Sequence, residues 1–504
     1  MATAVLLAPS TPPDYHRITS PTLRISDDHK VPIPVGILAC QRDPLLRYLT
    51  TSVVATSLSQ PVAPPTKKPA KKSVIAPTIP SDPLLEVILH DTVIFPEGGG
   101  QPTDTGLITT TANSTVWEVV QAKRHGGHAV HYVRVKDGDV DAALLALSPG
   151  ASVVVSLDQG GWDRRYDHMS MHTSQHLLSA LLETRLDLPT LSWSLTSYPS
   201  PCYVEIPRGM SPEEIISIQT EANRLVFEGR KVHIEVEELD RSKENGVPTL
   251  ETGRSVGKAL PDDYTGGVKR VVVIDGVDRN PCCGTHLPSI HNLQLFLLPH
   301  TEALSRSNTM SARLYFLAGP RLIAHLTSTH NLLTNTANIL SCGAPLVPDR
   351  VNQVVDERKR AEKRLDDVET DLARFIAGDL INELSRIEGG DGVYKKHVHR
   401  TDDSGNVLGF LNAISFALSN QLSSVTKPYV VVLTSSPSMQ TNTSTTVVLL
   451  VGSDDKLVKA GGEGLKSKLG VKGGGKGTKW SGKFIGVWRE AKESTAIEDV
   501  LSGL

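Results

Sequence analysis

Short runs of β-branched and apolar residues alternate with glycine, aspartate and proline in the first third of the chain. The runs near 84–95, 116–121, 128–135 and 151–157 have the length and composition of strands. Several short strands separated by turn residues are typical of a small barrel or a curled sheet. We therefore expect residues 33–160 to form a small β-barrel-like domain.

The pattern changes to helical spacing after residue 160. Leucines at 177, 178, 181 and 182 give the segment 167–185 one apolar face, which predicts a helix. Three strand-like runs and one helical run follow, at 202–206, 231–237, 269–274 and 212–227 respectively. This mixture predicts an α+β domain over residues 161–320.

Residues 351–376 show the clearest helical pattern of the chain. Positions from Val351 to Phe375 that alternate in steps of three and four are mostly apolar, and charged residues stand between them. That spacing is a heptad seam of about four repeats, and it lies within a predicted helical connector over 321–392. Its partner is either a helix of the same chain, which we favour, or a second copy in a homodimer.

The last part, residues 393–504, returns to an α/β pattern. A helix is predicted near 405–420, with strands near 428–434 and 445–451. A glycine- and lysine-rich stretch follows, with nine basic residues and one acidic residue between Lys456 and Arg489. The whole chain is thus predicted to be α+β, with a barrel, a mixed domain, a long helix and a glycine-rich α/β end.

Composition changes this picture in two places. Residues 1–32 are rich in Pro, Ser and Thr without periodicity, so we expect a disordered tail. Residues 58–83 include a Pro- and Lys-rich run, which predicts an exposed, disordered insertion in the barrel domain.

The compartment follows from charge, cysteines and hydropathy. The net charge is only −3. Five cysteines are few for a chain of this length, and their odd number argues against a secreted disulfide scaffold. No apolar run approaches the roughly 18 residues of a membrane span, and the first residues lack a signal-peptide pattern. We expect a cytoplasmic protein that does not enter a membrane.

Two short motifs carry candidate chemistry. In HTSQH, the spacing of His172 and His176 places both imidazoles on one face of a helix, where they could bind one metal ion. His168, one turn earlier, is either a third ligand or a surface residue.

The second motif, NPCCGTH, offers a thiolate and an imidazole in a turn that follows a predicted strand. Cys282 repeats a four-residue spacing to His286, whereas Cys283 does not. Thiolate and imidazole ligands together suit zinc. A buried structural cysteine beside a hydrogen-bonded histidine is the alternative, and we favour the metal.

A third block, DTVIFPEGGGQPTDTG at 91–106, and the run RRYDHM at 164–169 complete the pattern. Together these motifs resemble the long, AlaX-type alanyl-tRNA editing proteins, which are similar to the editing domain of alanyl-tRNA synthetase. The resemblance extends from about residue 36 to the C-terminus. It implies that one zinc ion is bound by His172, His176, Cys282 and His286.

The implied activity is hydrolysis of the ester between tRNA(Ala) and a wrong amino acid, serine above all, with glycine as a second candidate. Serine exceeds alanine by a hydroxyl, so selectivity requires a hydrogen bond rather than size exclusion. The family motif points to Thr92 for this contact, with Gln101 as a nearby polar group. The alternative for Thr92 is a strand threonine satisfied by its neighbours. Gly98, Gly99 and Gly100 either admit the aminoacyl end or only form a tight turn.

The glycine-rich end resembles the C-terminal domain of alanyl-tRNA synthetases. Its GVKGGGK segment nearly matches a phosphate-binding loop, but Gly477 stands where Ser or Thr is needed, so we expect no nucleoside triphosphate. Contact with tRNA phosphates explains the composition better, and a solvated loop is the alternative. The lysines expected to bind tRNA are Lys466, Lys468, Lys472, Lys476, Lys479 and Lys483.

Two other functions stay open. Threonyl-tRNA synthetases carry similar paired motifs, so the substrate could be a mischarged threonine tRNA. A non-catalytic RNA-binding protein with a structural zinc would show the same four ligands. A complete synthetase is not expected, because no stretch is typical of an ATP-binding aminoacylation core.

Overall fold

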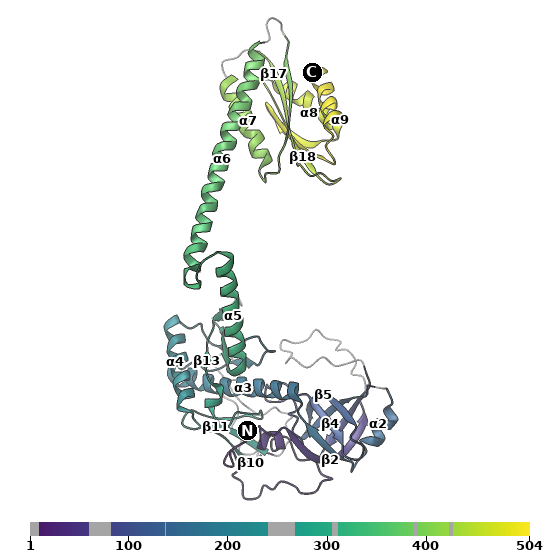
Figure 1. The fold of residues 1–504 in the computed structure, drawn as a ribbon, viewed down its shortest axis with the longest axis vertical. Helices are drawn as coiled ribbons and strands as arrows, with labels where there is room; N and C mark the ends of the chain where they lie inside the picture. Colours follow the sequence, from purple (N-terminus) through teal and green to yellow (C-terminus); the bar gives the residue numbers. More distant parts are fainter. Residues whose placement is uncertain are drawn as a thin grey trace, which may run out of the picture. The chain divides into compact units, whose positions relative to one another are not determined.

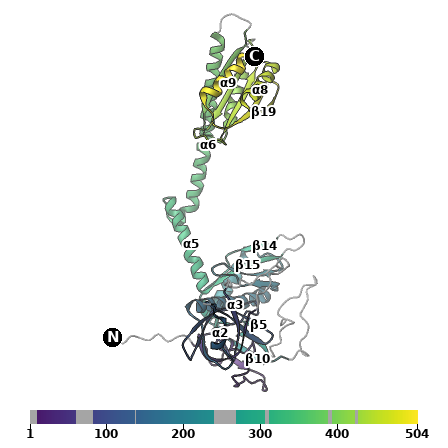
Figure 2. The same ribbon diagram turned by 90° about the vertical axis from the view of Figure 1, so that its right-hand side faces the viewer.

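The computed structural model describes residues 10–59, 82–136, 138–239, 268–304, 311–386, 392–422 and 427–504. The chain divides into two compact units, Met1–Leu333 and Thr334–Leu504 (Figures 1 and 2). Most of the predicted insertion, residues 60–81, lies outside the described residues, as do residues 1–9. No helix in the described part of the chain is both long and apolar enough to cross a membrane.

The predicted barrel is confirmed. Six strands close in the order β2-β3-β6-β5-β4-β7. Their bounds are β2 Tyr48–Leu58, β3 Leu84–Leu89, β4 Gly106–Thr110, β5 Val116–His125, β6 His128–Arg134 and β7 Ser152–Ser156. Leu85, Val87 and Leu89 alternate inward along β3, as a strand with one buried face requires. Strands β2 and β4 were not predicted, because threonines in both, and serines in β2, interrupt the apolar pattern.

Two short helices border the barrel, α1 (Ala39–Arg42) and α2 (Val140–Ala146). The rest of the first unit contains two further sheets. One has the order β1-β10-β11-β12, with bounds His16–Ile18, Val232–Glu238, Val268–Ile274 and Asp278–Pro281. The other has the order β13-β15-β9-β8, with bounds Phe296–Leu297, Ala312–Ala318, Cys202–Ile206 and Ser192–Ser194, and β14 (Thr301–Ala303) also pairs with β15. Helix α4 (Pro212–Glu228) and a 3₁₀ turn at Ile290–Leu293 complete this part.

The prediction of a disordered tail over 1–32 is wrong for the described residues from 10 onward. Strand β1 pairs in parallel with β10, and Tyr15 is only 1% exposed within the core. The Tyr15 hydroxyl donates a hydrogen bond to the backbone carbonyl of His286. A three-residue strand is too short to show an alternating pattern, so the composition of this segment wrongly predicted disorder.

Helix α3 (Gln159–Leu186) is the central helix of the first unit. Asp158 caps its first turn by accepting a hydrogen bond from the backbone N–H of Gly161. Every residue from 167 to 182 is buried, so the helix is enclosed on all sides rather than on one apolar face. Polar side chains on its middle turns must therefore find protein partners or a ligand.

The predicted long helix is also confirmed, as α6 (Val347–Arg386), which follows α5 (Gly319–Ile339) and a 3₁₀ turn at Ala344–Leu346. Residues 347–368 of α6 are exposed or nearly so, and Leu365 and Val368 are 57% and 62% exposed. Within the described part of the second unit, no helix covers this seam. The favoured intrachain partner is therefore not found in this unit.

The second unit is built on one sheet, in the order β16-β17-β18-β20-β19. The bounds are β16 Tyr394–Thr401, β17 Tyr429–Ser436, β18 Thr445–Gly452, β19 Lys472–Lys476 and β20 Lys479–Ile485. The end of α6 and helix α7 (Val407–Gln421) pack on one face. Helices α8 (Asp455–Leu469) and α9 (Glu490–Ser502) pack on the other face (Figure 1).

The glycine- and lysine-rich stretch is not a loop. It forms helix α8 and the hairpin of β19 and β20, in which Gly477 at φ +70° sits in the turn. The near match to a phosphate-binding loop thus runs from helix to strand, the reverse of the strand-to-helix order that such a loop requires.

Candidate metal centre

Four side chains from two distant segments converge in the first unit. His172 and His176 come from the middle of α3, and Cys282 and His286 come from the turn that follows β12. All four are buried, and their ligand atoms lie within 4.8 Å of one another. The structure thus brings together the four residues that the two motifs predicted, and this group could hold a metal ion.

The spacing suits a tetrahedral ion. The Sγ of Cys282 lies 3.3 Å from Nε2 of His172 and 3.4 Å from Nε2 of His286. Around an ion with bonds of about 2.0–2.3 Å, tetrahedral geometry separates the ligand atoms by about 3.4–3.6 Å. The side chains need little movement to meet this requirement.

Each imidazole is held by a partner on its other nitrogen. Gln101 Oε1 lies 3.0 Å from Nδ1 of His172, and Asp278 Oδ2 lies 2.7 Å from Nδ1 of His176. The Thr173 hydroxyl is 3.4 Å from Nδ1 of His286. These contacts turn the Nε2 atoms toward the centre of the cluster, which is the arrangement that orients histidine ligands in metal sites.

The protonation states also favour a metal. Burial opposes ionisation of Cys282, but the imidazoles of His172 and His176 outweigh it and hold the thiol pKa well below its usual range. Burial lowers the pKa of His286 far below its usual value, so this ring is neutral. Burial also disfavours the charged form of His176, but Asp278 and Cys282 prevail and raise its pKa to about 9. A metal would therefore displace a proton from His176 on binding.

The glycine turn of the third motif packs directly over the cluster. Gly98 and Gln101 exchange backbone hydrogen bonds across a tight turn in which Gly100 has φ +77°. A Cβ on Gly100 would stand 2.2 Å from the Trp193 ring, whose centroid is 5.1 Å from that of His172. Glycine here permits the turn and a close approach of the backbone to the indole.

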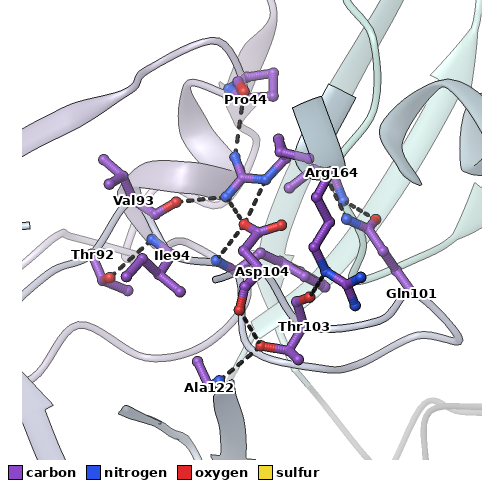
Figure 3. Close-up of polar contacts among 12 residues, drawn as sticks. Pro44, Thr92, Val93, Ile94, Gln101, Thr103, Asp104, Ala122 and Arg164 are labelled. Atoms are coloured by element: carbon purple, nitrogen blue, oxygen red, sulfur yellow. Dashed lines mark hydrogen bonds and ion pairs between the residues drawn. The ribbon is translucent and has the colours of Figure 1, made fainter. Parts of the chain in front are cut away.

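Two buried arginines hold these segments in place. Arg165 of α3 donates from Nε to Asp104 over 2.7 Å and from Nη2 to the carbonyl of Val93, and both charged side chains are 0% exposed. Figure 3 shows Asp104 between Val93 and Thr103, with Arg164 bonded to the Thr103 carbonyl. Arg165 thereby joins the helix that carries His172 and His176 to the barrel.

The second arginine fixes the other half of the cluster. Arg270 of β11 is fully buried and donates to the carbonyls of Cys282 and Gly284, at 2.9 and 2.5 Å. It also contacts the carbonyl of Gln41, while the Gln41 side chain donates to the carbonyl of Cys283. The shape of the CCGTH turn therefore depends on a side chain from a neighbouring strand.

Three predicted residues lie apart from the four-residue cluster. His168 is buried but is not one of its members. Cys283 is not a member either, and burial raises the pKa of this thiol to about 11. Thr92 lies beyond the end of β3 at Leu89, so the strand predicted over 84–95 is too long. Its hydroxyl is 2.8 Å from Nε2 of His131 and accepts the N–H of Ile94, so it is satisfied by its neighbours.

Sequence reasoning missed several residues that support the cluster. Asp278, Arg270, Trp193 and Tyr15 are separated from the motifs in sequence or look like ordinary strand residues. None of the four belongs to a sequence pattern that would have indicated its place beside the cluster.

Comparison with known proteins identifies the family. The chain is 32% identical over 499 residues to the putative alanyl-tRNA editing protein alaX of Saccharomyces cerevisiae, covering 94% of this chain and 97% of that protein. It is 29% identical over 463 residues to the alanyl-tRNA editing protein Aarsd1 of Mus musculus, covering 92% and 98%. The alanine–tRNA ligase of Thermococcus kodakarensis matches 60% of this chain at 28% identity, but only 30% of the ligase is covered.

No protein-family model matches the chain. The alignment with the yeast relative nevertheless covers almost the full length of both proteins at more than 30% identity. The HxxxH, CxxxH and GGGQP motifs also lie next to one another in the fold. The chain belongs to the family of alanyl-tRNA editing proteins.

Proposed function

We propose that the chain binds one zinc ion through His172, His176, Cys282 and His286 and hydrolyses mischarged alanine tRNA. Seryl-tRNA(Ala) is the proposed main substrate, with glycyl-tRNA(Ala) as a second candidate. The observation that carries this proposal is the four-ligand cluster, already surrounded by hydrogen-bond partners, in a chain of the alanyl-tRNA editing family. As an editing hydrolase it would act on free tRNA in the cytoplasm.

The ligand set favours zinc over harder cations. Three imidazoles and one thiolate suit zinc, whereas magnesium and calcium prefer oxygen ligands. When bound, zinc would supply a Lewis acid that positions the ester or lowers the pKa of a water molecule.

The surrounding residues would orient that site. Gln101 holds His172 and also accepts the N–H of Thr285, so one side chain ties the glycine turn to both zinc motifs. Asp278 holds His176 in the orientation that a ligand needs. Trp193 and the turn at Gly98–Gly100 cover the cluster, and we propose that the aminoacyl end enters beside this turn.

Selectivity for serine is proposed to depend on Gln101 and Thr92. Gln101 is supported by its position, because its side-chain amide lies next to the ligand His172. Thr92 is 1% exposed and its hydroxyl is engaged by His131, so it would act only if that contact opens. Thr92→Val should reduce serine cleavage while zinc content stays unchanged. Equal loss of zinc and of activity would show a purely structural role.

The lysines of the second unit are proposed to bind tRNA phosphates. Lys472 lies opposite Lys483 and Lys476 opposite Lys479 in the hairpin of β19 and β20. Like charges directly across a strand pair destabilise it, so a polyanionic partner would relieve this cost. Lys466 and Lys468 on α8 are exposed as well, each near one acidic side chain.

A homodimer through residues 351–376, or through the C-terminal domain, remains our proposal. The exposed seam on α6 supports it, since a heptad seam without a cover is stabilised by a second helix. Sedimentation of the full chain and of a Leu365→Asp, Val368→Asp variant tests this. A dimer that the variant dissociates supports the proposal, and a monomeric wild-type chain refutes it.

The test of the proposed function compares deacylation of serylated and alanylated tRNA(Ala) by the wild-type chain and a His172→Ala, Cys282→Ala variant. We expect the wild type to cleave only the serylated tRNA, and the variant to lose zinc and activity together. If the wild type instead cleaves a mischarged threonine tRNA, that tRNA is the substrate. Bound zinc without any cleavage would favour a non-catalytic RNA-binding protein.

A further inference from the structure

A cavity of about 740 Å³ lies beside the first turns of α3, wholly within the first unit. Its lining includes Arg47, Trp162, Arg164, Tyr166, His168 and Tyr198, and none of the four proposed zinc ligands. This volume falls in the range of about 300–1,000 Å³ that is usual for small-molecule sites.

Helix α3 fixes the distance between the cavity and the four-residue cluster. Arg164, His168, His172 and His176 are spaced four residues apart on α3, so their side chains form one row along the helix. At 1.5 Å per residue, His168 precedes the midpoint of the two proposed ligands by about 9 Å along the axis. A ligand that reaches from this cavity to the cluster must be about as long as one nucleotide.

The cavity presents buried polar atoms that lack partners. His168 is 3% exposed, and its Nδ1 has no hydrogen-bond partner among the residues that the structure describes. Arg164 donates from Nε to the carbonyl of Thr103, but its buried Nη2 also lacks a partner in the described part of the chain. Buried polar atoms are normally satisfied, so two such atoms around one cavity point to a polar ligand.

The charges and rings of the lining indicate which ligand. Two carboxylates belong to the lining, Asp163 and Asp167. Asp167 is held by two hydrogen bonds from Arg321, so its negative charge is neutralised. Asp163, by contrast, only accepts a hydrogen bond from Gln159 among the residues that the structure describes. The Cζ atom of the Arg47 guanidinium lies 4.1 Å from the centroid of the Trp162 ring. Tyr198, which also lines the cavity, is 54% exposed. Guanidinium groups beside flat aromatic rings provide contacts for a phosphate and for a stacked base.

We propose that this cavity binds the terminal nucleotide of the tRNA acceptor strand. The base stacks on Tyr198, the phosphate contacts Arg47 and Arg164, and His168 donates to or accepts from a polar group of the nucleotide. The ribose then carries its aminoacyl ester toward the metal cluster. This inference rests on the proposed function, because it assigns the substrate's nucleotide to a place beside that site.

The test is equilibrium binding of the 5′-phosphorylated trinucleotide CCA to the zinc-loaded full chain, measured by calorimetry. Tyr198→Ala should weaken binding about tenfold, the usual effect of removing one stacking partner. Arg47→Ala should also weaken binding. It should reduce the slope of the logarithm of the binding constant against the logarithm of the salt concentration by about 0.7. The matched controls are Tyr48→Ala, an exposed tyrosine that does not line the cavity, and Arg358→Ala on α6.

Zinc content and melting temperature of each variant establish that it is folded. Trinucleotide binding that neither Tyr198→Ala nor Arg47→Ala changes, or that the controls weaken equally, would overturn the inference. Binding involves no reaction, so the two proposals can fail separately. A chain that binds the trinucleotide in this cavity without cleaving serylated tRNA would retain the inference and lose the activity.

Discussion

Gly284 offers a direct way to displace one proposed zinc ligand without removing it. A Cβ at this position would stand 2.2 Å from Cε1 and 2.3 Å from Nδ1 of His172. It would also stand 2.8 Å from the Gln101 oxygen that accepts from this ring. The turn cannot easily move away, because Arg270 holds the Gly284 carbonyl at 2.5 Å.

The size of the effect follows from these distances. Carbon atoms pack at about 3.5–4.0 Å, so Gly284→Ala must push the His172 ring back by more than about 1 Å. Metal–ligand distances tolerate only about 0.2 Å, so His172 would no longer bind. If four ligands share an apparent binding free energy of about 10–16 kcal/mol, the loss of one costs about 3 kcal/mol, or more than about 100-fold in affinity.

The assay is competition for zinc with a chromophoric chelator, followed by deacylation of serylated tRNA. The matched control is Gly98→Ala in the facing turn, where a Cβ would meet only the Pro96 carbonyl at 3.7 Å. We expect Gly98→Ala to bind zinc as the wild type does and Gly284→Ala to lose zinc and activity together. Zinc affinity of Gly284→Ala within threefold of the wild type would refute the geometry of the cluster.

Three further predictions concern stability and RNA binding. Asp104→Ala should destabilise the first unit by about 3–5 kcal/mol in urea unfolding, because it leaves the fully buried Arg165 unpaired. Burial lowers the pKa of His131 to about 4. Between pH 6.5 and 4 the unfolded chain therefore binds a proton at this residue that the folded chain does not, and the free energy of unfolding falls by up to about 3 kcal/mol as pH falls over this range. His131→Leu should remove that part of the acid destabilisation measured by thermal unfolding. Lys472→Ala and Lys476→Ala should each weaken tRNA binding and reduce its logarithmic salt slope by about 1.

Each of these has a result that contradicts it. An Asp104→Ala protein that unfolds at the wild-type urea concentration would show that the pair with Arg165 is not a structural tie. Unchanged acid destabilisation of His131→Leu would place the titrating group elsewhere. A salt slope that neither lysine variant alters would remove the β19–β20 hairpin from the tRNA interface.

The four residues of the cluster were predictable because helix geometry and short turns are local. The four-residue spacing of His172 and His176 places two imidazoles on one face wherever a helix forms, and α3 does form there. The heptad spacing of 351–376 likewise predicted the long helix α6, although it could not say what covers the seam.

What the sequence did not reveal depends on contacts between distant segments. Asp278 lies 102 residues from His176, and no local pattern indicates their contact. Tyr15 and strand β1 are ordered by pairing with β10, more than two hundred residues away, so a short run without periodicity looked disordered. In the second unit, glycine content concealed helix α8, which packs its small residues against the sheet.

The most direct test of the central claim removes the metal and returns it in measured amounts. The full chain is stripped with a chelator, and the rate of serylated tRNA(Ala) deacylation is followed as zinc is added back. We predict that the rate rises in proportion to bound zinc and reaches a plateau at one equivalent, with no cleavage of alanylated tRNA. Full activity in the stripped chain, or none after one zinc ion has bound, would contradict the assignment of hydrolysis to this cluster.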